Sequence, residues 1–185
     1  IPYYQEPNYY ALVVIAGLIF RVNVDSKKVV LLSRDIRLGQ YQPRVNWSYG
    51  DAYIILFDWP NYPVIVQGDK AFRSDPDHMR AGFLEPQVPI SVMGTYNKNR
   101  LFIANAGIEF TAGDPVGSLT TPDAPITFTE LFTPASPYRD QFFSLPTGDT
   151  AWPITAMGFL QEVDENTGIG PMFMSSEKDV FFART

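Results

Sequence analysis

Proline and glycine interrupt this chain every few residues, and that spacing limits what it can fold into. There are 16 Pro and 13 Gly in 185 residues. Almost no window of about 12 residues is left in which an uninterrupted amphipathic helix could form. The intervals between them are short and rich in Val, Ile, Phe and Tyr, which is typical of β-strands. The sequence therefore predicts an all-β protein.

Eleven segments of this kind are predicted strands: residues 11–15, 18–24, 28–32, 52–58, 64–66, 90–96, 100–104, 109–112, 154–160, 172–175 and 180–183. Some alternate apolar and polar residues, as residues 20–24 do, and others are apolar throughout, as residues 29–32 are. The first pattern indicates a half-buried strand and the second a fully buried one. Residues 127–132 are the one plausible helical turn, because Thr127 and Glu130 have capping-box spacing, although a strand fits nearly as well.

An internal repeat gives the strands an order. Residues 89–96 (PISVMGTY) match residues 153–160 (PITAMGFL) at Pro, Ile, Met and Gly, and residues 100–112 align without a gap with residues 171–183. Each copy is predicted to be a three-stranded antiparallel meander in which Phe102 and Phe173 occupy equivalent inner positions. Met93 and Met157 are both expected to be buried.

The repeat favours repeated antiparallel meanders of three to four strands, arranged like the blades of a β-propeller. The expected copies lie at about residues 10–33, 52–73, 88–117 and 152–183 of one all-β region, residues 1–185. A single β-sandwich with two similar hairpins is the alternative fold. Four blades at most fit in this length, and the chain starts with Ile1 and ends in an apolar strand. These features predict a piece of a longer polypeptide or a subunit that neighbours complete.

Composition excludes several functional classes. The chain has no Cys, which excludes disulfides, thiol nucleophiles and thiolate metal sites. Its net charge of −6 argues against nucleic acid as a main partner. The most apolar run, residues 11–20, is too short for a bilayer-spanning helix, so we expect no membrane insertion.

The sequence resembles a group of β-rich virion proteins of tailed bacteriophages that have propeller-like repeats. The resemblance begins in residues 88–117 and continues through residues 126–130, 142–146, 154–157 and 167–171, so that it covers about half of the chain. It implies a structural component of the phage tail or its distal nozzle, without enzymatic activity. Its implied partners are other virion proteins, copies of itself and a host surface glycan or receptor.

Candidate catalytic residues are few. His78 lies between Asp77 and Met79 in a turn sequence, and a lone His predicts neither a metal site nor a Ser–His nucleophile. Paired carboxylates for glycoside cleavage remain an alternative, since Glu85, Glu109, Glu130, Glu162 and Glu165 could meet in space. We therefore expect no catalytic, cofactor or metal site. The alternative functions are a carbohydrate-active enzyme on a β-repeat fold and a capsid or decoration β-sandwich.

The first ten residues are the candidate interface. They contain Tyr3, Tyr4, Tyr9 and Tyr10 with two Pro, a composition suited to an extended arm that lays aromatic rings on a partner. A strand of the same domain is the alternative. We expect a homo-oligomeric ring in which these tyrosines pack on a neighbouring subunit and acidic loops such as residues 162–165 face outward.

The substitution His78→Ala tests the assignment of His78 to a turn. We expect the free energy of unfolding to change by less than about 0.5 kcal/mol, because a turn residue without a ligand loses little on truncation. Urea denaturation measures this change. An ion bound to the His78 ring would contradict the assignment.

Overall fold

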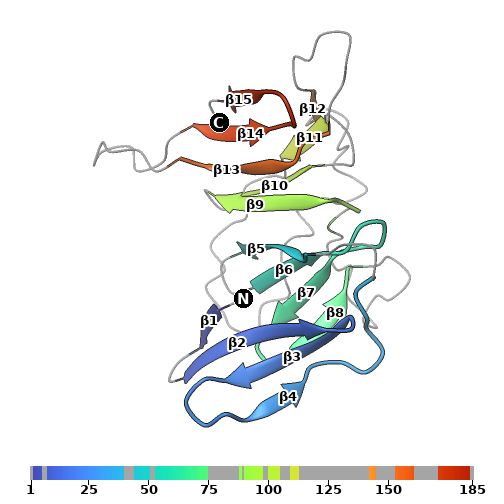
Figure 1. Ribbon diagram of the computed structural model, residues 1–185, viewed down its shortest axis with the longest axis vertical. Helices are drawn as coiled ribbons and strands as arrows, with labels where there is room; N and C mark the ends of the chain where they lie inside the picture. The colour runs from blue at the N-terminus through green and yellow to red at the C-terminus, as the bar shows by residue number, and fades with distance from the viewer. Residues whose placement is uncertain are drawn as a thin grey trace.

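The computed structural model of the protein describes residues 2–5, 8–39, 44–50, 53–74, 88, 90–97, 100–104, 109–112, 142–144, 153–160 and 171–183. These residues form fifteen strands in four antiparallel sheets (Figure 1). The described part of the chain contains no helix. The all-β prediction is therefore confirmed.

Each sheet is built from consecutive strands. Sheet A contains β1 (Pro2–Gln5), β2 (Asn8–Ile15), β3 (Leu18–Asn23) and β4 (Val29–Leu31). Sheet B contains β5 (Asn46–Gly50), β6 (Tyr53–Phe57), β7 (Val64–Gln67) and β8 (Lys70–Arg73). Sheet C contains β9 (Met93–Asn97), β10 (Arg100–Ala104), β11 (Glu109–Ala112) and β12 (Phe142–Ser144). Sheet D contains β13 (Ala156–Phe159), β14 (Met172–Ser175) and β15 (Val180–Ala183).

The turn between β2 and β3 shows how the sequence sets these meanders. Ala16 and Gly17 both have positive φ, at 50° and 78°. Positive φ at both central residues is the signature of the two-residue turn that matches the twist of paired strands. Gly17 also accepts a 2.8 Å hydrogen bond from the Leu38 N–H, which holds the chain after β4 against this turn.

Sheet B is buried on both faces, and alternate residues of its strands point to different neighbours. One set of side chains packs with Leu12, Ile19 and Leu38 on the side of sheet A: Ile54, Leu56, Val64 and Val66. The other set packs with Val88, Leu101 and Ile103 on the side of sheet C: Tyr53, Ile55, Phe57 and Ile65. Because side chains alternate along a strand, one pair of apolar strands supplies two cores.

Sheet C uses the same alternation to reach sheet D. Phe102 and Ala104 face away from sheet B and pack with Ile154, Met172 and Met174. The Phe102 and Phe159 rings meet edge to face with their centroids 5.2 Å apart, a favourable aromatic geometry. The four sheets therefore form one stack in sequence order, with sheets A and D at its two ends (Figure 1).

The first strands of sheets B, C and D lie close together. β5 neighbours β9, and β9 neighbours β13. The Asn46 side-chain amide donates a 3.0 Å hydrogen bond to the Val92 carbonyl, which joins β5 to the residue before β9. Gly94 in β9 allows sheet C to pack closely on sheet B, because a Cβ there would lie 2.5 Å from Cζ of Phe57 in β6. The same Cβ would also lie 2.7 Å from the carbonyl oxygen of Phe102 in the neighbouring strand β10.

All eleven predicted strands are confirmed, with ends shifted by a few residues. The strand at residues 2–5 was an alternative interpretation of the first ten residues, the strand at 70–73 falls within the expected copy 52–73, and the strands at 46–50 and 142–144 were not predicted. The possible helical turn at residues 127–132 lies outside the described residues.

The two repeat segments both form antiparallel meanders, but their registers differ by one residue. Phe102 pairs with Thr95, whereas the aligned Phe173 pairs with Gly158. Met93 and Met157 consequently come from opposite sides to the same core between sheets C and D. The expectation that both are buried is wrong, since both are half-buried. Phe102 and Phe173 lie on corresponding faces of their sheets, but Phe102 is buried and Phe173 is only half-buried, because sheet D ends the stack.

Replacing Gly94 by Ala should destabilise the protein by about 1 to 3 kcal/mol, because the added methyl group overpacks the contact between sheets B and C. Gly158→Ala is the matched control: its Cβ would meet the half-buried Phe173 ring at 2.9 Å, and that ring is able to move. Urea denaturation of both variants measures the difference. Equal losses of stability would contradict the packing described for β9.

Candidate interaction surface

The four tyrosines of the first ten residues belong to sheet A. β1 pairs with β2 so that Tyr3 lies opposite Tyr10 and Tyr4 opposite Tyr9. The first residues therefore form a hairpin of the domain, which is the strand alternative considered above, and not a separate extended arm.

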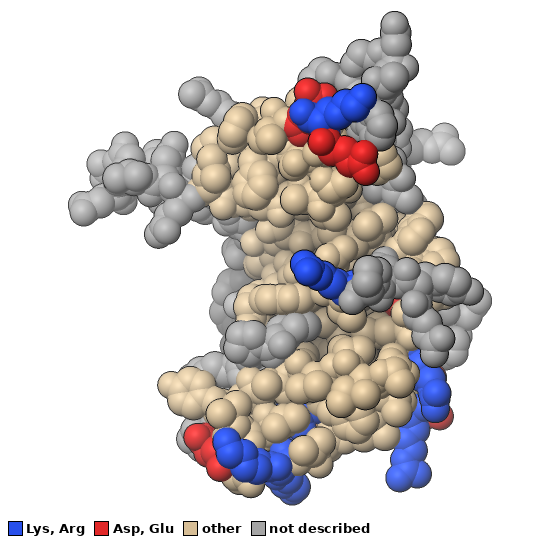
Figure 2. All heavy atoms as spheres, viewed as in Figure 1, with Lys and Arg blue, Asp and Glu red and all other residues tan. Residues whose placement is uncertain are grey.

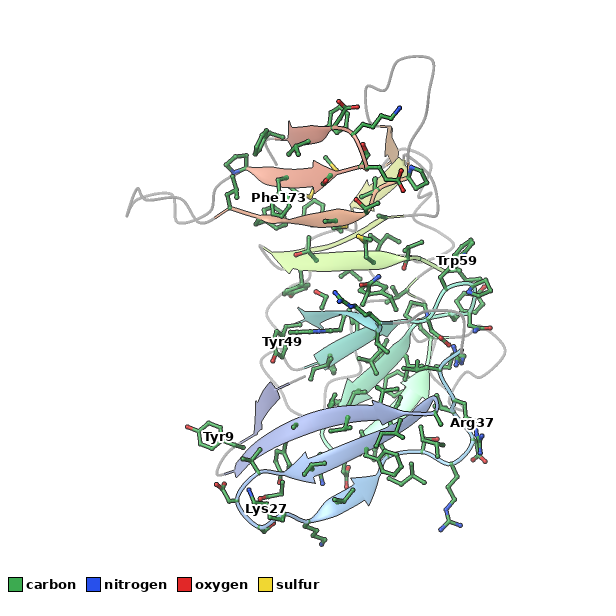
Figure 3. All side chains as sticks on the ribbon, viewed as in Figure 1. Tyr9, Lys27, Arg37, Tyr49, Trp59 and Phe173 are labelled. Carbon is green, nitrogen blue, oxygen red and sulfur yellow. The ribbon has the colours of Figure 1, made fainter. Side chains whose placement is uncertain are left out.

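Tyr9 and Tyr10 occupy different environments. The side chain of Tyr9 is 61% exposed, and it is one of the labelled residues in Figure 3. Tyr10 is half-buried, and the Arg21 guanidinium lies 4.6 Å from its ring centroid. A cation over an aromatic face at this distance is attracted by the ring quadrupole. Tyr10 and Arg21 thus contribute to the internal packing of sheet A, and Tyr9 is the more accessible of the two.

The largest candidate surface is the face of sheet A that points away from sheet B. We call it the outer A face, and the pairing of β2, β3 and β4 assigns to it nine apolar residues: Ala11, Val13, Ile15, Leu18, Phe20, Val22, Val24, Val29 and Leu31. Ile15 and Val29 are 60% and 59% exposed. Tyr9, which lies opposite Val24, is on the same side of the sheet, so the face also carries the polar Tyr9 hydroxyl. The opposite, core-facing side of the same sheet includes Arg21 and Asn23. An apolar face of this extent is unusual on an isolated soluble domain.

Sheet D has a corresponding surface at the other end of the stack. The outer D face comprises the residues that point away from sheet C: Ala156, Gly158, Leu160, Phe173, Ser175, Val180 and Phe182. Val180 and Phe182 are 60% and 62% exposed. Phe173, which is labelled in Figure 3, lies over Gly158. It pairs with Phe182, so two aromatic residues are neighbours on this face.

Charges of opposite sign surround the two faces. At the sheet A end of the stack, four exposed basic residues outnumber two exposed acidic ones: Lys27, Lys28, Arg34 and Arg37 against Asp25 and Asp35. Beside the outer D face, the β14–β15 turn exposes Glu177 and Asp179 with one basic residue, Lys178. Figure 2 shows mainly blue side chains at the sheet A end and mainly red ones at the sheet D end.

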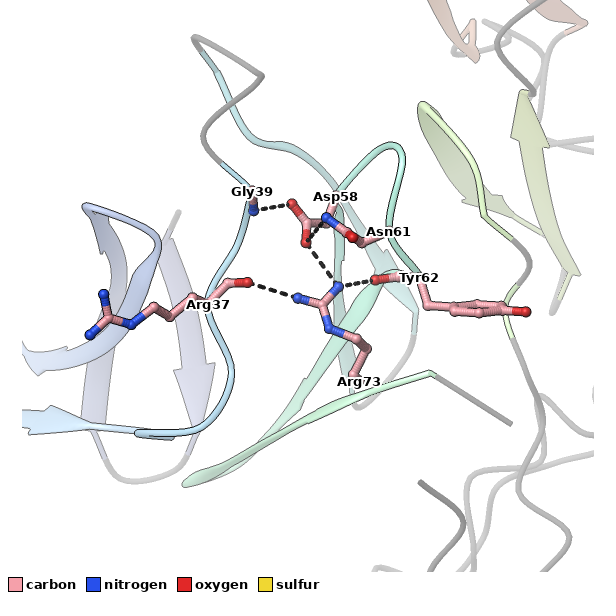
Figure 4. Close-up of polar contacts among 6 residues, drawn as sticks. All are labelled: Arg37, Gly39, Asp58, Asn61, Tyr62 and Arg73. Atoms are coloured by element: carbon pink, nitrogen blue, oxygen red, sulfur yellow. Dashed lines mark hydrogen bonds and ion pairs between the residues drawn. The ribbon is translucent and has the colours of Figure 1, made fainter. Parts of the chain in front are cut away.

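A buried ion pair stabilises the junction between sheets A and B. Asp58, at the end of β6, is 4% exposed and receives a 2.8 Å hydrogen bond from Arg73 of β8 (Figure 4). The same carboxylate accepts hydrogen bonds from the Gly39 N–H at 2.6 Å and from the Asn61 amide at 3.3 Å. Arg73 also donates to the carbonyl oxygens of Arg37 and Tyr62.

These contacts explain the position of the chain that follows β4. Residues 37 and 39 are held to sheet B by Arg73 and Asp58, and Leu38 between them is buried in the A–B core. Both oxygens of the carboxylate are used by protein donors, as a buried charge requires. The cluster is therefore suited to positioning sheet A rather than to catalysis.

Most sequence-predicted site residues cannot be placed. His78, Glu85, Glu130, Glu162 and Glu165 lie outside the described residues, and of Glu109 only the backbone, in β11, is described. Among the described residues, no group of three or more His, Cys, Asp or Glu is arranged to hold a metal ion. No helix in the described part of the chain is long and apolar enough to cross a membrane.

Sequence reasoning did not identify the two outer faces. The alternation in residues 20–24 was present, but it predicts only that one side of the strand is buried. The structure places Arg21 on the side of sheet B and Phe20 and Val22 on the outer side. The available signal was that residues 11–15 and 29–32 are apolar at every position, so that both faces of sheet A are apolar.

No protein-family model matches this chain, and no curated protein matches its sequence significantly.

Replacing Arg73 by Met should cost about 3 kcal/mol of stability, because the buried Asp58 carboxylate loses its counter-charge. The double variant Asp58→Asn with Arg73→Met should be more stable than Arg73→Met alone, since it leaves no unpaired buried charge. Arg37→Met is the matched control and should change stability by less than about 0.5 kcal/mol, because only the Arg37 carbonyl takes part in the cluster. Guanidinium denaturation measures all three. A double variant less stable than Arg73→Met would contradict this role.

Proposed function

We propose that this protein is a structural component of a bacteriophage virion, most specifically of the tail or its nozzle, and that it acts by assembling with other copies of itself and with other virion proteins. The observation that carries the proposal is the pair of apolar outer faces at the ends of the stack. A chain that keeps such faces at both ends is built to be covered by further protein.

The arrangement of the sheets supports a propeller-like architecture. Each sheet is a meander of consecutive strands, successive sheets stack face to face, and the first strands β5, β9 and β13 lie next to one another. In propellers, each small sheet likewise buries its faces against its neighbours around a shared axis. In the described residues the stack remains open, with sheets A and D at opposite ends (Figure 1).

The phage assignment rests on the resemblance in residues 88–117 and the segments that follow it. β9, β10 and β11 lie in this region and form the first three strands of sheet C. Tail components can contact the host surface. We propose that the exposed Tyr9 side chain of sheet A contributes to binding a surface glycan or receptor.

Particle analysis tests this proposal. Purified phage particles whose genome encodes this chain should contain it at a fixed copy number by quantitative mass spectrometry. Antibodies against the chain should label the tail, and not the capsid, in electron micrographs. Particles that lack the protein, or antibodies that label only the capsid, would contradict the tail assignment.

A further inference from the structure

We propose that the outer A face of one copy binds the outer D face of a second copy, so that the chains associate head to tail and continue the stack of sheets. This inference deepens the assembly role proposed above and rests on it. It assigns the two halves of the self-contact to specific strands: β2, β3 and β4 on one copy, and β13, β14 and β15 on the other.

The internal contacts of the chain supply the geometric argument. Every sheet has one face toward the sheet A end of the stack and one toward the sheet D end. At each of the three junctions, the second face of one sheet packs on the first face of the next sheet. The outer D face points beyond the sheet D end of the stack, and the outer A face points beyond the sheet A end. Joining them between two copies therefore continues the face-to-face stacking that holds the four sheets of one chain together.

The composition of the two faces fits the same contact. The outer A face is formed by branched aliphatic residues around Phe20, and the outer D face presents Phe173 and Phe182 with Val180. Aromatic rings from one sheet and aliphatic residues from the next also fill the internal junctions, as Phe57 does opposite Leu101 and Ile103. Sheets of this kind pack about 10 Å apart with interdigitated side chains.

Charge selects this contact over the two symmetric alternatives. Two outer A faces in contact would bring together their basic rims, which contain Lys27 and Lys28 of the turn before β4. Two outer D faces would bring together two acidic rims, each with the exposed Glu177 and Asp179. The A-to-D contact brings the basic rim next to the acidic one, and complementary charge at a rim favours association and fixes register.

A head-to-tail contact leaves one free face at each end of any open assembly. Such a heterologous contact produces a closed ring when its rotation closes, and a filament when it does not. Either product is larger than a dimer, which separates this contact from a symmetric one.

The test is a mixing experiment with two variants of the full chain. Ile15→Lys places a charge on the outer A face, and Phe182→Lys places one on the outer D face. Both side chains are more than half exposed in the single chain, so folding should be retained, as circular dichroism would verify. Trp59→Lys is the matched control, because Trp59 is also exposed but lies in the turn after β6, outside both faces (Figure 3).

Sedimentation velocity between about 1 and 100 μM provides the readout. The natural chain and Trp59→Lys should form species larger than a dimer. Each face variant alone should associate at least about tenfold more weakly, because a lysine charge would be buried in the contact. An equimolar mixture of the two variants should form a 1:1 dimer and nothing larger, since one undamaged face remains on each chain and the two are complementary.

Three results would overturn the inference. If Ile15→Lys prevents association while Phe182→Lys still forms dimers by itself, and the mixture contains no dimer that includes Ile15→Lys, the contact joins two outer A faces. If neither variant weakens association, the chains meet elsewhere, and the proposed structural role is unaffected. If the natural chain stays monomeric at 100 μM, self-association through these faces does not occur, and the particle analysis decides separately whether the chain is a virion component.

Discussion

The structure depends on the two-sided burial of sheet B. Ile54 and Leu56 in β6 pack toward sheet A, while Ile55 and Phe57 in the same strand pack toward sheet C. All four side chains are at most 2% exposed, so this one strand joins the two halves of the stack. Burying a side chain of this size contributes about 1.5 to 3 kcal/mol. A polar residue at position 54 or 56 would therefore weaken the junction with sheet A, and one at position 55 or 57 the junction with sheet C.

Apolar packing brings the sheets together, and a few polar contacts set their positions. Asp58 follows β6 directly, and through Arg73 and the Gly39 N–H it fixes the segment that returns from sheet A. Asn46 connects β5 to the chain before β9 in a comparable way. Each contact lies at the edge of an apolar core, where a satisfied hydrogen bond orients neighbouring elements without leaving a buried charge unpaired.

The sequence predicts the strands better than it predicts what covers them. Uninterrupted apolar runs, such as residues 53–57 and 101–104, are local signals and were identified. β5 was not, although Asn46, Trp47, Ser48 and Tyr49 alternate polar and aromatic residues. In the structure the small polar Ser48 is buried and the aromatic residues are partly exposed, because the strand is placed by its neighbours in sheet B and by β9. The outer A face was not identified, although residues 11–15 and 29–32 are apolar at every position, because the alternation of residues 20–24 alone does not say which surface each side of the strand meets. The one-residue difference in register between the repeats likewise depends on packing between sheets and not on the shared Met-Gly pair.

The central claim is that the sheets stack in sequence order, with the residues of β6 divided between two cores. Methyl-labelled NOE spectroscopy tests it most directly. The account predicts cross-peaks from Ile55 to Leu101 or Ile103 of sheet C, and from Leu56 to Leu12 or Ile19 of sheet A. Cross-peaks from Ile55 to the sheet A residues, or cross-peaks joining both β6 residues to a single sheet, would contradict it.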